Sequence, residues 1–223
     1  MFTLEISSVG LTGFSLDDSH TLYCEFAIPR SLVNPSSEKP WGPMTLLTDD
    51  LNAVIGPAST RFAEHRSELM LEANPAGIRL RFHVPGALTR TKMVPDHAEE
   101  RQHKLSLREL TKAAKASAED SKLLSLAGAT FSQEGPVRVS IGDGHLSLGP
   151  SIDDSLTFDV NSEGRATTTV LDRAFRIVNA YVQPREPPRL TFRVVDDGVL
   201  SFEAEYPFGA TVRYVVTQVA QDQ

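Results

Sequence analysis

The stretch Ser15-Leu16-Asp17-Asp18-Ser19 recurs almost unchanged as Ser151-Ile152-Asp153-Asp154-Ser155. An alternating strand pattern follows each copy, over residues 21–26 and 156–160. Two later stretches also align, the first without a gap and the second after a two-residue slip: Leu69–Ile78 with Leu190–Val199, and Gly86–Thr91 with Gly209–Tyr214. The offset of roughly 120–136 residues is too long for a solenoid repeat. The sequence therefore predicts two domains of one fold, each with its own core.

Composition sets broad limits on this chain of 223 residues. Its apolar fraction of 40% and charged fraction of 23% are ordinary for two small globular domains. The single cysteine, Cys24, excludes an internal disulfide framework and favours a reducing compartment. No apolar stretch reaches the ~20 residues of a membrane span, and no signal-peptide pattern is present. The net charge of −7 does not exclude nucleic-acid binding, which depends on where the cations lie.

Hydrophobic periodicity predicts an α+β protein rich in antiparallel strands. Helical spacing predicts helices over 44–55, 106–118 and 170–179, the first ended by Gly56-Pro57 and the second begun by a capping box of Ser106 and Glu109. The polar segment 95–103 is the expected connector between domains 1–94 and 104–223. Alternation predicts strands over 2–6, 11–16, 21–28, 68–73, 78–84, 88–94, 137–141, 145–148, 156–160, 190–195, 199–206 and 211–218.

The two copies differ at their start. The helix expected over 106–118 precedes the second copy's first hairpin, and nothing precedes the first copy's hairpin at Phe2. Either the first copy lacks a strand and helix that a complete copy would carry, or the copies have diverged.

Residues Gly10–His20 resemble the early strands of the proliferating cell nuclear antigen (PCNA) family of DNA sliding clamps. In that family a Gly-Leu/Ile strand leads to an apolar-Asp-x-Ser-His turn, and a strand of alternating apolar residues follows. Ala166–Asn179, Val199–Glu203 and Val212–Val216 are similar to the family's strand-to-helix element and later strands. Two features depart from the pattern: the family's opening strand and first helix are absent, and Thr217-Gln218 replaces its Ala-Pro.

The resemblance implies the DNA clamp fold, with two similar domains of antiparallel sheet plus helices. It implies a homotrimeric ring that slides on double-stranded DNA and binds a clamp loader, a polymerase, a nuclease or a ligase. It also implies an intracellular location, either an archaeal cytoplasm or a eukaryotic nucleus. No cofactor, metal or catalytic residue is expected, because a clamp makes and breaks no bonds. Ring closure would use edge strands 89–94 and 156–160, since an unpaired edge accepts another strand. Checkpoint clamp subunits share this fold.

Sliding requires cations that meet phosphates without reading bases. On the helix expected over 106–118, three basic residues fall at i, i+4 and i+7 on the face opposite the apolar stripe, and two more share a face of the helix over 170–179. Ordinary solvated helix faces are the alternative interpretation. The five candidate DNA-binding residues are Arg108, Lys112, Lys115, Arg173 and Arg176.

The family's partner site lies between the connector, the early Asp-x-Ser-His turn and the last strands. Matching the family's motif residue by residue gives six candidate partner-binding residues: Leu16, His20, Met93, Val94, Val199 and Val215. Ordinary core packing is the alternative explanation for the aliphatic residues among them. The altered end at Thr217-Gln218 puts this site in doubt.

Enzymatic interpretations find little support. The six histidines are scattered, with none at metal-ligand spacing to Cys24 or to another histidine. The two Asp-Asp pairs recur at the same structural position, which favours turn chemistry over paired acid and base. The remaining alternatives are a checkpoint-type or specialised subunit of a mixed ring, and a β-rich adaptor that binds only protein.

Overall fold

The computed structural model describes residues 1–17, 21–33, 41–61, 68–74, 77–101, 103–105, 107, 110, 113–118, 135–151, 153–171, 189–196 and 198–217. The chain forms two compact units. The first contains Met1–Ser15 and Pro29–His103, and the second contains Leu16–Ile28 and Lys104–Gln223. The strand over 22–28 thus belongs with the second unit, although it lies in the first sequence copy. The expected domains 1–94 and 104–223 remain predictions.

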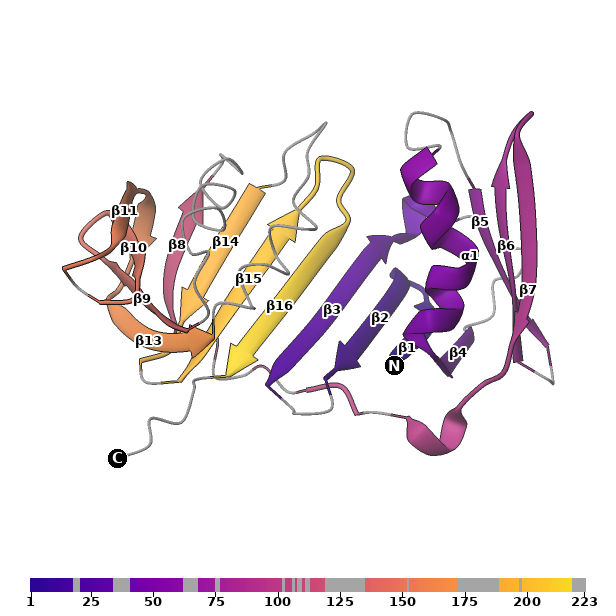
Figure 1. Cartoon of the computed structure of the whole chain (residues 1–223), viewed down its shortest axis with the longest axis horizontal. Coiled ribbons are helices and arrows are strands. Elements are labelled where there is room, and N and C mark those ends of the chain that lie inside the picture. Colours follow the sequence, from indigo (N-terminus) through magenta and orange to yellow (C-terminus); the bar gives the residue numbers. More distant parts are fainter. Residues whose placement is uncertain are drawn as a thin grey trace. The chain divides into compact units, whose positions relative to one another are not determined.

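In its described part, the first unit combines two antiparallel groups of strands with one α-helix (Figure 1). Strand β1 pairs with both β2 and β4, and β5, β6 and β7 form a separate three-stranded sheet with β6 in the centre. Helix α1 packs against β6 and β7. The elements are β1 (Phe2–Ser7), β2 (Gly10–Leu16), η1 (Arg30–Leu32), β4 (Trp41–Leu46), α1 (Thr48–Arg61), β5 (Glu68–Asn74), β6 (Gly77–Val84), β7 (Leu88–Val94) and η2 (Ala98–Glu100).

Alternation buries one face of β6. Ile78, Leu80, Phe82 and Val84 are buried, whereas the intervening side chains face outward. Gly77 is required where β6 begins, because a Cβ there would lie 2.1 Å from the carbonyl oxygen of Val94 and because its φ is +139°.

The second unit contains a larger antiparallel sheet and a smaller one. The larger sheet runs in the order β12-β8-β14-β15-β16-β3, and the smaller sheet in the order β11-β10-β9-β13. One apolar core, which includes Ala116, Val139, Phe192, Leu200 and Tyr214, joins them. The strands are β3 (Leu22–Pro29), β8 (Ala114–Ala118), β9 (Pro136–Gly142), β10 (His145–Gly149), β11 (Leu156–Asp159), β12 (Asn161–Glu163), β13 (Ala166–Leu171), β14 (Arg189–Val194), β15 (Val199–Glu205) and β16 (Thr211–Thr217).

The expected helix over 106–118 is wrong over its last part. Ala114–Ala118 forms β8, which pairs with β12 on one side and β14 on the other. Alanine favours a helix in isolation, but two strand partners override local propensity. The buried side chains of Ala114 and Ala116 follow the two-residue period of a strand.

The other helix predictions need smaller corrections. Helix α1 begins at Thr48 rather than at Met44, because residues 41–46 form β4, and it continues through Gly56-Pro57 to Arg61. The helix expected over 170–179 is wrong at its first two residues, because Val170 and Leu171 belong to β13. Its residues 172–179 lie outside the described residues.

The repeat is visible in the structure, with a one-residue correction. Strands β5, β6 and β7 correspond to β14, β15 and β16. The turn from Asn74 to Gly77 contains two residues, whereas the turn from Val195 to Val199 contains three. Ile78 therefore corresponds to Leu200 rather than to Val199. The same offset between the copies makes Thr91 correspond to Arg213 rather than to Tyr214.

Candidate partner-docking and DNA-binding sites

The Asp17 carboxylate organises the turn that follows Leu16. Its Oδ1 accepts hydrogen bonds from the backbone N–H groups of Thr21 at 2.7 Å and Leu22 at 2.8 Å, and its Oδ2 accepts one from the Thr21 hydroxyl at 3.0 Å. A short polar side chain that binds nearby backbone is the usual reason for aspartate in a turn. Leu16 is thereby fixed at the end of β2. His20, its predicted neighbour in the site, lies outside the described residues.

Strands β15 and β16 bring two predicted site residues together. Val199 pairs with Thr217, and Val215 pairs with Ser201, so the two valines are diagonal neighbours on one face. The backbone N–H of Thr217 donates to the carbonyl of Thr21 at 3.0 Å, which joins this end of β16 to the Asp17 turn. Leu16, Val199 and Val215 therefore gather at the same end of the sheet.

Val215 and Val199 differ in accessibility. Val215 is 5% exposed and is packed like a core residue, whereas Val199 is half-buried. A partner can contact Val199 directly but reaches Val215 only if the side chains covering it move.

Tyr23 is a member of this cluster that sequence reasoning missed. It lies opposite Val215 on β3 and is 1% exposed. Its hydroxyl donates to Oε2 of Glu25 at 3.4 Å. Burial, followed by the charge of Glu25, raises the pKa of Tyr23 far above its ordinary value, and a hydrogen bond with the backbone of Leu105 opposes this shift. The alternation of residues 21–28 predicts that Tyr23 lies in a strand, but it does not predict which residues lie beside Tyr23 in the sheet.

The segment after the connector is fastened to the same face. Lys104 forms an ion pair with Glu25, and the next residue, Leu105, meets Tyr23 through its backbone while its side chain is 40% exposed. A row of charges continues across the sheet, because Arg213 lies opposite Glu25 and donates from Nε to Glu203 at 2.7 Å. Leu105 thus presents an apolar side chain beside charged residues that are paired with one another.

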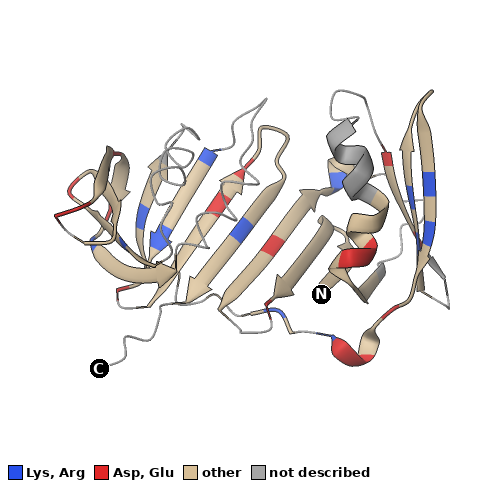
Figure 2. Cartoon of the chain, in the orientation of Figure 1, with Lys and Arg blue, Asp and Glu red and all other residues tan. Residues whose placement is uncertain are grey.

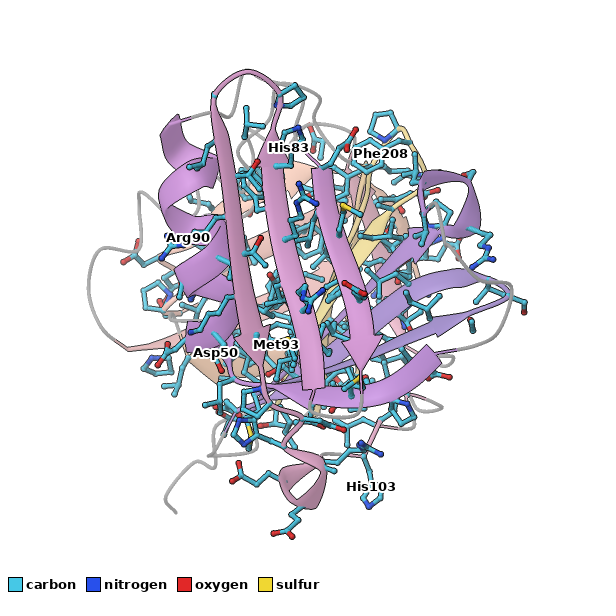
Figure 3. The ribbon with its side chains drawn as sticks, turned by 90° about the vertical axis from the view of Figure 1, so that its right-hand side faces the viewer. Asp50, His83, Arg90, Met93, His103 and Phe208 are labelled. Carbon is cyan, nitrogen blue, oxygen red and sulfur yellow. The ribbon has the colours of Figure 1, made fainter. Side chains whose placement is uncertain are left out.

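Met93 and Val94 belong to the first unit. Val94 is 1% exposed and completes the core against β6, whereas Met93 is 42% exposed and lies opposite Arg79 (Figure 3). Only Met93 of this pair offers side-chain surface to a partner.

Of the five candidate DNA-binding residues, only Lys115 is described. It lies on β8, opposite Arg193 of β14 and Glu163 of β12. The expectation that it shares a helix face with Arg108 and Lys112 is therefore wrong. Arg108, Lys112, Arg173 and Arg176 lie outside the described residues.

The two strands expected to close a ring are both sheet edges among the described residues. Strand β7 pairs with β6, and β11 pairs with β10, at the ends of their sheets. Arg90 is exposed on β7, and Lys92 on the same strand binds Asp50 of α1 at 2.6 Å (Figures 2 and 3). On β11, Asp159 is exposed and lies 3.0 Å from Nδ1 of His145. One edge is thus basic and the other acidic.

The described part of the chain contains no group of three or more His, Cys, Asp or Glu side chains that could hold a metal ion. It also contains no helix both long and apolar enough to cross a membrane.

Comparison with known proteins gives a consistent answer at the level of fold. No family model matches the chain, and no curated protein matches it. Among solved structures, the chain is similar to one in the crystal structure of a PCNA2–PCNA3 complex from Sulfolobus tokodaii, with 18% identity and a TM-score of 0.75 over 99% of this chain and 90% of that one. It is also similar to PCNA from Thermococcus kodakaraensis, with 12% identity and a TM-score of 0.74 over 97% of this chain and 89% of that one. The chain has the α+β fold of PCNA-type DNA clamps.

Proposed function

We propose that this chain is a subunit of a DNA sliding clamp, a processivity factor for replication and repair. Three copies close head to tail into a ring around duplex DNA, and the ring tethers a polymerase, nuclease or ligase after a clamp loader has opened it. The clamp fold supports this proposal. The chain works inside the cell and has no chemistry of its own.

The observation that carries the proposal is a strand pairing inside the chain, between the second sequence copy and the first. Strand β16 pairs antiparallel with β3, from Thr211 opposite Ala27 to Val216 opposite Leu22. By the internal repeat, β7 corresponds to β16, and β11 follows the second Ser-x-Asp-Asp-Ser motif as β3 follows the first. Strands β7 and β11 each lie at the edge of their sheet among the described residues. Pairing β7 of one subunit with β11 of the next subunit would repeat, between subunits, the pairing of β16 with β3 inside the chain.

Charge at the edges favours this pairing over pairing of like edges. Arg90 lies on β7, and Asp159 on β11. Two β7 edges brought together would place cations against cations, whereas β7 against β11 places opposite charges together. Head-to-tail contacts of one kind close a ring when the rotation per copy divides a full turn.

DNA would be held by cations without base contacts. The residues we assign to this role are Arg108, Lys112, Arg173 and Arg176, with Lys115 contributing from β8 rather than from a helix. Contacts to phosphate alone give binding that is non-specific and strongly weakened by salt. Such binding lets the ring slide.

Partner proteins would dock at the end of the sheet where the Asp17 turn meets β15 and β16. Leu16, His20 and Val199 are the assigned contacts, and Leu105 adds a 40% exposed apolar side chain. We also assign Met93, on the first unit, as a partner contact. Val94 and Val215 are buried, Val94 in the first unit and Val215 in the second, and each supports its own unit from beneath the surface.

A mixed ring is the second candidate. One of the similar solved structures is described as a complex of two different PCNA chains. Thr217-Gln218, in place of the family's Ala-Pro, also fits a specialised subunit. A β-rich adaptor that binds only protein is a third possibility, from a different functional class.

Retention on DNA separates these candidates. A ring loaded on nicked circular DNA stays bound through gel filtration, and it slides off after the circle is cut once. A protein-only adaptor is retained on neither form. A chain that is retained on circles only after a second clamp chain is added supports the mixed ring.

A further inference from the structure

Equivalent leucines in the two copies differ sharply in exposure. Leu190 on β14 is 2% exposed, whereas Leu69, its counterpart on β5, is 42% exposed. The next core-facing position repeats the difference, since Phe192 is 2% exposed and Leu71 is half-buried. Strand β14 pairs antiparallel with β15 in the same way as β5 pairs with β6, so these hairpins do not explain the difference in exposure.

The difference lies on the other edge of each strand. Strand β14 is covered there by β8, with Ala116 opposite Phe192 and Ala118 opposite Leu190. Strand β5 is the end of its sheet among the described residues. Among the described residues, its core-facing leucines therefore lack the cover that β8 gives in the second unit.

We propose that the free edge of β5 binds an extended segment of a partner protein, which adds as a fourth strand and occupies the place that β8 occupies beside β14. Strand addition of this kind takes its affinity from main-chain hydrogen bonds and its specificity from alternate side chains. The site lies on the first unit, and it does not depend on ring formation.

The neighbouring strand defines the chemistry of the segment. Positions opposite Leu69 and Leu71 require small apolar side chains, because β8 places alanines opposite their equivalents. The next position along the segment, beyond the one opposite Leu71, lies beside Glu72, where the second unit has Arg193 opposite Lys115. Glu72 is exposed and pairs with Arg79 at 3.1 Å. A lysine in the partner segment therefore meets a carboxylate on β5, whereas Lys115 meets a cation on β14. The favoured segment is small-Lys-small in an extended conformation, with the lysine opposite Glu72 and the two small residues opposite Ala73 and Leu71.

A capped peptide with the sequence Ala113–Ala118 is the probe, because it contains this pattern and forms a strand in the intact chain. Hydrogen–deuterium exchange on the full-length protein measures its binding. At ten times its dissociation constant, the peptide should slow exchange of the free-edge amides of Glu68–Asn74 by about tenfold. Exchange in β7 and β11 should not change. A peptide with proline in place of Ala116 should protect nothing, because proline removes a ladder donor.

Leu69→Asp should abolish the protection, and Val9→Asp is the matched control, since Val9 is an apolar residue of the same unit that is 70% exposed. Three outcomes overturn the proposal: no protection of β5 at millimolar peptide, equal protection by the proline peptide, or protection located at β7 or β11. Protection of β5 that rises with protein concentration in the absence of peptide also overturns it, because a second copy then occupies the edge.

Discussion

Val215 on β16 lies directly opposite Tyr23 on β3, so a strand of the second sequence copy pairs with a strand of the first. Both side chains are buried, at 5% and 1% exposure. The Tyr23 hydroxyl also meets Glu25 and the backbone of Leu105. Tyr23 thus packs where β3 of the first copy pairs with β16 of the second. It also contacts Leu105, in the segment that follows residues 95–103.

Removing the ring of Tyr23 should destabilise the second unit strongly. Tyr23→Ala should lower the free energy of unfolding by about 3–5 kcal/mol, as for other large aromatic truncations in a core. Tyr23→Phe keeps the ring and should lower it by about 1 kcal/mol through the lost hydrogen bonds. Urea unfolding followed by circular dichroism measures both. Equal losses for the two variants would contradict the assigned packing role.

The two copies of the Asp motif should respond differently to mutation. Asp17→Ala removes an acceptor of three hydrogen bonds and should lower stability by about 1–3 kcal/mol. Asp153 is exposed, so Asp153→Ala should change stability by less than about 0.5 kcal/mol. Asp17→Asn, which keeps one oxygen acceptor, should lie between the two. Equal effects of the two alanine variants would show that the Asp17 turn is not fixed as described.

Strand positions were largely predictable because alternation is a local signal. Leu88–Val94 matches the predicted range, and most other strands match to within one residue at each end. Strand β8 was not predictable in this way, because Ala114–Ala118 has helical propensity and becomes a strand only between β12 and β14. Lys115 was misplaced for the same reason. The gathering of Leu16, Val199 and Val215 followed from the family resemblance, whereas Tyr23 and Leu105 depend on tertiary contacts that no local pattern contains.

Cys24 should be nearly inert in the folded protein. Burial raises the pKa of its thiol to about 11, and a hydrogen bond with Tyr214 partly opposes this shift. At pH 8 about one thiol in a thousand is then ionised, so alkylation by iodoacetamide should be on the order of 100-fold slower than in the urea-unfolded chain. Equal rates in the folded and unfolded protein would contradict the burial of this side chain.

The same shift makes stability fall at high pH. The folded thiol holds its proton above the unfolded pKa of about 8.5–9, so its contribution is complete below that pH and is lost as pH rises toward 11. The free energy of unfolding should drop by on the order of 1–2 kcal/mol between about pH 8 and 10. Cys24→Ala should reduce the drop. Tyr23 also has a raised pKa and titrates above about pH 10, so the comparison of slopes is best made below that pH.

Charge reversal at the edges tests head-to-tail assembly. Arg90→Glu and Asp159→Arg should each raise the dissociation constant of the assembly by about tenfold or more, because each places like charges together. The double variant should recover most of the loss. Arg81→Glu is the matched control, since it reverses an exposed cation on the central strand β6. Sedimentation velocity over a range of concentrations measures assembly. No recovery in the double variant would argue against pairing of β7 with β11.

Charge reversal on the assigned DNA residues should separate DNA binding from assembly. Lys112→Glu with Arg173→Glu should abolish association with duplex DNA and leave the mass of the assembly unchanged. Each lost phosphate contact should reduce the slope of log K against log salt by about 0.9. Arg81→Glu again serves as the control, and fluorescence anisotropy over a salt series measures affinity. Unchanged affinity in the double variant would refute these assignments.

The central claim is that copies of this chain close into a ring that encircles DNA. The most direct measurement is the mass of the complex on nicked circular DNA, before and after the circle is cut, by gel filtration with light scattering. We predict a protein mass of about three times 24.4 kDa on the intact circle, lost when the circle is cut. A monomer mass, with equal retention on circular and linear DNA, would contradict the claim.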